Sequence, residues 1–201
     1  MRPSFDVERV NSVFPASYYY SSKRWAGYNF FDHEYTFADY DLFIKEVDDY
    51  LNSQAYAGYP IFVTSNKKQV YNIPCSFDIE ASSFYDEGTR AKAACMYIWQ
   101  FGFNGSVIYG RTWDEFFEFL EMFAEYLQLG PDRWIYIYVH NLSYEFQWIK
   151  KYFEWDEIFA LKKRKVAKAI FSPLGLEFRC SYLLTNAGLA HVSDKLITRY
   201  E

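Results

Sequence analysis

The chain has 201 residues, the size of one domain with room for an appendage, and its 51% of hydrophobic residues argue against a disordered or collagen-like chain. The formal net charge of −5 argues against a protein that coats DNA, because binding along the phosphate backbone depends on clustered Lys and Arg. Three cysteines without a close pair argue against a disulfide scaffold and against a cysteine-based zinc site.

The sequence holds no candidate membrane segment. No apolar run approaches the length of about 18 residues that a membrane helix needs, and the N-terminal sequence MRPSFDVERV lacks the apolar core of a signal peptide. We therefore expect a cytoplasmic protein without a membrane partner.

Aromatic residues make up 23% of the chain, more than one hydrophobic core needs beside its Leu, Ile and Val. Two explanations stay open. Exposed rings can stack on the bases of single-stranded nucleic acid, at about 1–3 kcal/mol per base. An AT-rich coding sequence, whose codons favour Phe and Tyr, gives the same composition.

Residues 1–70 are predicted to form an aromatic-rich N-terminal extension. The segments Tyr18-Tyr19-Tyr20 and Gly58-Tyr59-Pro60 interrupt them, and only residues 39–52 show a helical period, with apolar residues at intervals of three or four. The sequence pattern changes near residue 70, where we place the one domain boundary.

From Ile73 onward, strands and helices alternate. Asn104-Gly105 predicts a two-residue hairpin turn, and Thr112 to Glu115 form a capping box that begins a helix. Strands are predicted at 73–77, 95–103, 107–109, 134–139, 167–171 and 176–182, and further helices near 143–152 and within 183–195. This order predicts a mixed sheet with helices packed on it, an α/β domain over residues 71–201.

Asp78 and Glu80 form an acid-x-acid pair at the end of the first of these strands. Because strand side chains alternate, both carboxylates point to the same face, and the carboxyl edge of an α/β sheet is the usual place for a site. Repelling carboxylates stay ionised most easily around a hard divalent cation, Mg²⁺ or Mn²⁺. The alternative is an ordinary solvated strand edge.

A second group of polar residues, His140-Asn141-Leu142-Ser143-Tyr144-Glu145, follows the buried run at 134–139. If the two strands are neighbours, Glu145 brings a third carboxylate to the edge where Asp78 and Glu80 lie. The alternative is that Asn141 or Ser143 is an N-cap and Glu145 a favourable acid in the first helical turn. Both can hold together.

These two motifs, FDIE and, 65 residues after Glu80, the Glu145 of HNLSYEF, resemble the first two exonuclease motifs of family B DNA polymerases, most closely the protein-primed polymerases of bacteriophages. The resemblance covers about residues 71–195. It implies a ribonuclease H-like domain that removes nucleotides from single-stranded DNA 3′ ends by two-metal hydrolysis, in a proofreading role during DNA replication inside a bacterial host cell. Asp78, Glu80 and Glu145 would hold Mg²⁺ or Mn²⁺ and act in catalysis, while Asn141, Leu142 and Tyr144 would bind the DNA.

The sequence departs from the family's pattern at three points. Glu145 stands where the family usually has Asp, and Ala81 where it often has Thr. The third motif, Y-x-x-x-D, is expected downstream of Cys180, but Tyr182 is followed four positions later by Asn186 instead of Asp. Polymerase motifs are not found either. The chain is thus expected to be an exonuclease portion, truncated before its third motif. Its expected partners are a single-stranded DNA 3′ end and either terminal protein or the missing polymerase portion.

Three readings of function therefore stay open. The first is the exonuclease, and the second is a catalytically silent fragment that binds single-stranded DNA or docks on replication proteins. The third is an unrelated α/β protein whose motifs are only caps and edge charges. Lys162, Lys163, Arg164, Lys165 and Lys168 could contact phosphates or could protect a hairpin edge.

Overall fold

The computed structural model describes residues 33–86, 88 and 91–192, which belong to a compact unit beginning at His33. This boundary lies well before the predicted one near residue 70, because residues 33–70 contribute to the core. Phe43 and Val47 are fully buried, and the ring of Phe43 packs against Phe103 of the sheet. Residues 1–32 lie outside the described part, as does the end of the helix expected within 183–195.

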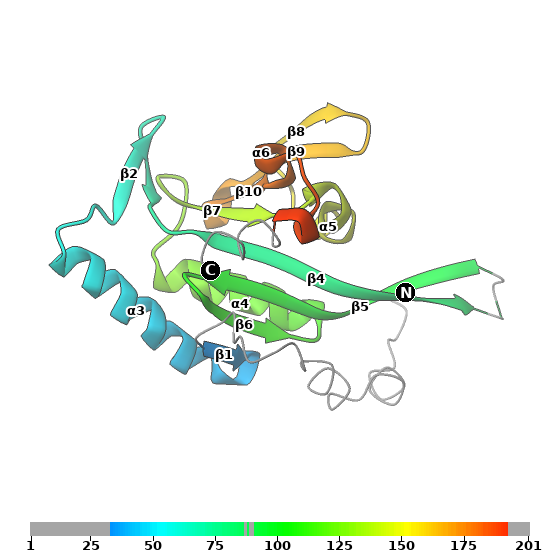
Figure 1. Cartoon of the computed structure of the whole chain (residues 1–201), viewed down its shortest axis with the longest axis horizontal. Helices are drawn as coiled ribbons and strands as arrows, with labels where there is room; N and C mark the ends of the chain where they lie inside the picture. The colour runs from blue at the N-terminus through cyan, green and yellow to red at the C-terminus, as the bar shows by residue number, and fades with distance from the viewer. Residues whose placement is uncertain (1–32, 87, 89–90, 193–201) are drawn as a thin grey trace. The chain divides into compact units, whose positions relative to one another are not determined.

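The described chain forms a mixed sheet with helices (Figure 1). The strands are β1 (His33–Thr36), β2 (Phe62–Ser65), β3 (Lys68–Tyr71), β4 (Cys75–Asp86), β5 (Ala91–Phe103), β6 (Ser106–Gly110), β7 (Arg133–Val139), β8 (Glu157–Lys162), β9 (Lys165–Phe171) and β10 (Leu176–Cys180). The helices are η1 (Phe37–Asp39), α3 (Tyr40–Tyr56), α4 (Trp113–Tyr126), α5 (Leu142–Ile149), η2 (Ser172–Leu174) and α6 (Tyr182–Thr185). The α/β class and the mixed sheet agree with the sequence prediction.

The strands lie in the order β1-β6-β5-β4-β7-β10-β9-β8. β7 is central and runs parallel to both neighbours, β4 and β10, while the pairs β4–β5, β5–β6, β10–β9 and β9–β8 are antiparallel. β3 also pairs with the first residues of β7, so β3 and β4 follow one another along the same side of it. The predicted central strand is therefore confirmed.

Local sequence signals explain several of these elements. At the start of α4, the amide of Glu115 donates to the Thr112 hydroxyl (3.2 Å) and the Glu115 carboxylate accepts from the Thr112 amide (2.9 Å). This is the predicted capping box, which satisfies amides that lack a helical partner. Between β5 and β6, Asn104 and Gly105 both have positive φ, as a tight hairpin turn requires.

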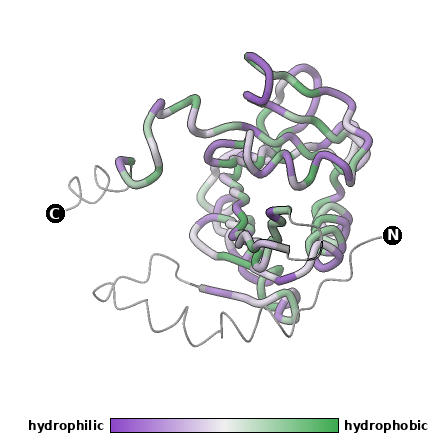
Figure 2. The backbone as a smooth tube through the Cα atoms, turned by 90° about the vertical axis from the view of Figure 1, so that its right-hand side faces the viewer, coloured by the Kyte–Doolittle hydropathy of each residue, from purple (hydrophilic) through white to green (hydrophobic). Residues whose placement is uncertain are grey.

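The helices α3, α4 and α5 pack on one face of the sheet, where aromatic side chains form most of the core. Phe116 of α4 stacks on Phe77 (centroids 4.6 Å apart), and Phe119 stacks on Trp99 (5.5 Å). Figure 2 shows hydrophobic and hydrophilic residues alternating in short stretches along the described chain, as expected where each element buries one side. The opposite face of β4 carries the polar residues, including Asp78.

β4 extends far beyond the predicted strand at 73–77. It continues to Asp86, pairing with β5 alone, and Figure 1 shows this two-stranded ribbon running past the other strands. Asp78 and Glu80 therefore lie within β4 and not at its end, which corrects their predicted position. The ribbon was not predicted because its outer residues, such as Ser82 and Ser83, have no apolar alternation; their partners on β5 hold them in the strand.

Candidate active site

The candidate site forms where β4 and β7 separate. The last residues paired between these parallel strands are Ser76 and Tyr138. Two positions further along, β4 presents Asp78 and the chain after β7 presents His140. The expectation that the two motifs meet depended on the two strands being neighbours, and they are neighbours.

Asp78 and Glu80 point to the same face of β4. Phe77 (2% exposed) and Ile79 (5%) are buried on the helix-covered face, whereas Asp78 is exposed and Glu80 half-buried. A bulge in β5 lies opposite the next step of β4, because Glu80 pairs with Ile98 and Ala81 with Met96, which makes Tyr97 the extra residue. Bulges re-aim side chains and are common beside functional sites.

Both carboxyls are harder to ionise than usual. Although Asp78 retains contact with solvent, the surrounding protein atoms dehydrate its carboxyl and raise its pKa, against a backbone hydrogen bond from Ile79 and the charge of His140, which lower it. Dehydration also raises the pKa of Glu80, and the charge of Asp78 adds to this. The pair repels as predicted.

Glu145 reaches the same place from the first turn of α5. Its side chain is 4% exposed, and its Oε2 atom is buried without a hydrogen-bond partner. Burial, opposed by a hydrogen bond from its own backbone amide and assisted by the charge of Asp78, raises the pKa of Glu145 to about 7. The charge of Asp78 thus acts on both other carboxyls, Glu80 and Glu145.

The start of α5 has an unusual cap. Asn141 occupies the N-cap position in a left-handed conformation (φ 66°), and its side chain makes no capping hydrogen bond. Asparagine tolerates this conformation better than most residues. Asn141 is therefore the N-cap residue, as the capping alternative predicted, but its exposed side chain does not cap the helix.

The three residues expected to bind DNA are placed differently from one another. Tyr144 is 47% exposed and contacts Trp148 edge-on (centroids 6.2 Å apart), and Asn141 is exposed. Leu142 is completely buried in the core. The side chains available to a ligand are those of Asn141 and Tyr144.

His140 was not among the residues that the sequence analysis expected to act in the site. Its Nδ1 lies 3.4 Å from the Ser181 hydroxyl, its ring packs edge-on against Tyr182, and its charge acts on Asp78. The available signal was its position, the first residue beyond β7 at the same level as Asp78. Tyr182 itself lies in α6, and Asn186 forms the C-cap of that helix.

The donor chemistry of the site suits a hard divalent cation, because the charge of Asp78 acts on two further carboxyls and one buried carboxyl oxygen has no partner. As the side chains stand, however, the described residues contain no group of three His, Cys, Asp or Glu that could hold a metal ion. A cation would be held by Asp78 together with Glu80 or Glu145.

Comparisons with known proteins do not add to this description. The sequence matches no protein-family model and no curated protein.

In the described part of the chain, no helix has the length and apolar character needed to span a membrane.

Proposed function

We propose that the chain is a 3′–5′ exonuclease with a ribonuclease H-like fold, the proofreading portion of a phage-type protein-primed DNA polymerase. The observation that carries the proposal is the buried Glu145 Oε2 atom, which has no hydrogen-bond partner and belongs to a carboxyl on which the charge of Asp78 acts. Buried polar atoms are nearly always hydrogen-bonded, so an unpaired carboxylate oxygen among like charges supports a site that is completed by a cation.

Each residue has a role that its surroundings support. Asp78 and Glu80 hold Mg²⁺ or Mn²⁺ on the polar face of β4, and Glu145 adds a ligand from α5. The bound cations would activate water and stabilise the leaving 3′ oxygen. Tyr144 stacks on a base at the 3′ end, and the Asn141 amide donates to it, since both side chains are exposed next to the acids.

One observation favours a second candidate, a silent protein that binds single-stranded DNA through the same residues. The described acids do not form a ready group of three metal ligands. Glu145 also carries one methylene more than the Asp usual in the resembled family, and a misplacement of about 1 Å can cost on the order of 100-fold in rate.

The deciding experiment follows the degradation of a 5′-labelled single-stranded oligonucleotide in Mn²⁺ and in EDTA. The chain should give a ladder that shortens from the 3′ end in Mn²⁺ only, and Asp78→Ala/Glu80→Ala should give none. A matched control, Glu118→Ala/Glu121→Ala, removes two exposed carboxylates from α4 and should degrade DNA normally.

Two results would overturn the exonuclease. DNA binding by the chain without any ladder would support the silent binder, and neither binding nor cleavage would leave the acids as edge charges and caps. Activity that survives in Asp78→Ala/Glu80→Ala would contradict the metal site itself.

A further inference from the structure

The turn between β8 and β9 gathers four consecutive cations, Lys162 to Lys165. Lys162, Lys163 and Arg164 are exposed, and within the described residues none of the four forms an ion pair. The ion pair of this hairpin lies further back, where Lys168 Nζ is 2.9 Å from Glu157. The cations at the turn are therefore available to an external anion.

Strand register places this turn at the same edge of the sheet as the three acids. Tyr138 of β7 is level with Arg179 of β10, which is level with Lys168 of β9. β9 runs opposite to β7, so moving three residues back along β9, from Lys168 to Lys165, corresponds to moving three residues forward from Tyr138. Lys165 therefore lies at the level of Asn141. The turn then lies at the level of the first residues of α5.

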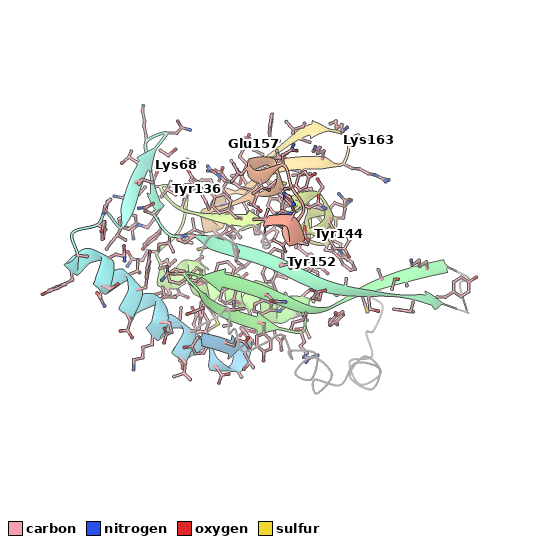
Figure 3. The ribbon with its side chains drawn as sticks, viewed as in Figure 1. Lys68, Tyr136, Tyr144, Tyr152, Glu157 and Lys163 are labelled. Carbon is pink, nitrogen blue, oxygen red and sulfur yellow. The ribbon has the colours of Figure 1, made fainter. Side chains whose placement is uncertain are left out.

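Figure 3 agrees with this placement. Lys163 and Tyr144 lie toward the right-hand end of the view, whereas Lys68, on the β2–β3 hairpin, lies toward the left-hand end. Lys68 also has a partner there, since its Nζ lies 3.5 Å from the ring centroid of Trp134. The available cations of the hairpin and the exposed tyrosine of α5 thus share one end of the sheet.

The sideways separation follows from the strand order. Asp78 and Glu80 lie on β4, from which β9 is three strands away and β8 four, which at a spacing of about 4.8 Å corresponds to roughly 14–19 Å. A nucleic-acid strand advances about 3.4 Å per nucleotide when stacked and up to about twice that when extended. The distance from these acids to the turn is therefore about two to six nucleotides.

We propose that Lys162, Lys163, Arg164 and Lys165 bind the phosphates of a single-stranded nucleic acid about two to six nucleotides upstream of the end held at the acids. The proposal rests on the proposed function, because it takes the strand end to lie at Asp78 and Glu145. The cations offset the repulsion between the three carboxylates and the phosphates, and they fix the direction in which the strand leaves the site.

Edge protection explains the distribution of charge less well. A solvent-exposed edge strand avoids pairing with other chains when charges lie along it. Yet β8 exposes Ile158 (48%), Phe159 (52%) and Leu161 (54%) along its length, and its cations begin only at Lys162. The positive charge is concentrated at the end nearest the site instead of along the strand.

The test measures the affinity of the protein for an oligothymidylate of twelve nucleotides as a function of salt concentration. EDTA is present, so that no cleavage occurs. Lys163→Gln/Arg164→Gln should lower the slope of log affinity against log salt by about 1.4, since each contact with a single strand contributes about 0.7. This corresponds to about 25-fold weaker binding at 0.1 M salt if both proteins bind equally at 1 M. Lys45→Gln/Lys67→Gln removes the same charge from exposed positions elsewhere and should change the slope little.

DNA in which a few phosphates are replaced by uncharged linkages shows which phosphates the cations contact. Methylphosphonate linkages placed about two to six nucleotides from the 3′ end should weaken binding of the unmodified protein about as much as the double substitution does. Combined with Lys163→Gln/Arg164→Gln, they should cause little further loss, because both changes remove the same interaction. The same linkages near the 5′ end should not show this coupling.

The outcomes separate this proposal from the proposed function. If the unmodified protein does not bind the oligonucleotide in EDTA, the phosphate contact fails, and the ladder in Mn²⁺ tests the proposed function separately. If it binds, and neither Lys163→Gln/Arg164→Gln nor Lys162→Gln/Lys165→Gln changes the slope while both stay folded by thermal unfolding, only the phosphate contact fails. Aggregation of both variants with an unchanged slope would assign the cations to edge protection.

Discussion

At the amino end of β7 backbone and side-chain polar groups are hydrogen-bonded, whereas beyond its carboxyl end two side chains lack the hydrogen bonds expected of them. Gly130 and Arg133 exchange backbone hydrogen bonds (2.9 and 3.3 Å), Trp134 Nε1 donates to the Pro131 carbonyl (2.7 Å), and Arg133 donates to the Gln128 amide oxygen (2.9 Å). At the other end, Glu145 Oε2 has no partner and the Asn141 side chain makes no capping bond. One strand thus separates a region whose polar groups are hydrogen-bonded from one where a buried carboxyl oxygen has no partner.

The largest effect is expected at the amino end, from Gly175→Ala. Gly175 has a positive φ of 59°, and a Cβ there would overlap with the carbonyl oxygen of Arg133 and the backbone of Gly130. Backbone atoms cannot move aside cheaply, so we expect a loss of about 3–5 kcal/mol in the free energy of unfolding, measured by denaturant titration. A loss under about 1 kcal/mol would show that the amino end is less tightly packed than described.

Glu145→Gln, unlike Gly175→Ala, should increase the free energy of unfolding above neutral pH. Below about pH 4.5 the Glu145 carboxyl is protonated in both states. As the pH rises toward 7, the unfolded chain releases this proton while the folded chain keeps it, so stability falls by about 3 kcal/mol across this window. Glu145→Gln removes that loss and should stabilise the protein at pH 8 but not at pH 4. Equal effects at both pH values would contradict the raised pKa.

Tyr144→Ala should weaken binding to single-stranded DNA by about 1–3 kcal/mol and binding to duplex DNA much less, because only an unpaired base offers a face for stacking. Fluorescence anisotropy with the two DNA forms measures this difference. Tyr56→Ala, at a fully exposed position on α3, is the matched control. Equal losses on both DNA forms would contradict the stacking role.

Mn²⁺ should raise the thermal stability of the folded protein at pH 8, by about 1.4 kcal/mol at a concentration ten times its dissociation constant. Asp78→Ala/Glu80→Ala should abolish this shift, and Glu118→Ala/Glu121→Ala should keep it. A shift that persists without Asp78 and Glu80 would place cation binding elsewhere in the chain.

The smallest effect on stability is expected from Asn141→Gly. Glycine adopts the left-handed conformation without strain, and the Asn141 side chain makes no capping bond that could be lost, so stability should change by only a few tenths of a kcal/mol. Affinity for single-stranded DNA should nevertheless fall, as measured by anisotropy. A large loss of stability would identify Asn141 as a structural cap after all.

The sequence predicted those elements whose signals are local. The capping box at Thr112, the turn at Asn104-Gly105 and the apolar run of β7 each depend on a few neighbouring residues, and all three were found in the structure. β8 was missed because every residue of it is exposed, so no alternation marks it, and only its pairing with β9 makes it a strand.

The candidate site was predictable only in part. The shared face of Asp78 and Glu80 follows from strand geometry. Whether Glu145 lies near Asp78 depends on β4 and β7 being neighbours, and the sequence does not determine the order of the strands. The burial of Leu142 follows from the packing of α5 against the sheet. Likewise, residues 33–70 looked like an extension because their contacts with β6 and β7 are distant in sequence.

The bulge after Glu80 also sets where the chain can change length. Beyond it, β4 and β5 pair only with each other among the described strands, so a matched deletion of two residues from each strand would shorten the ribbon and leave the register at Asp78 unchanged. Removing a single residue from β4 would instead exchange the two faces of that strand on one side of the deletion. Natural or engineered insertions should therefore accumulate in the ribbon and stop at Ala81.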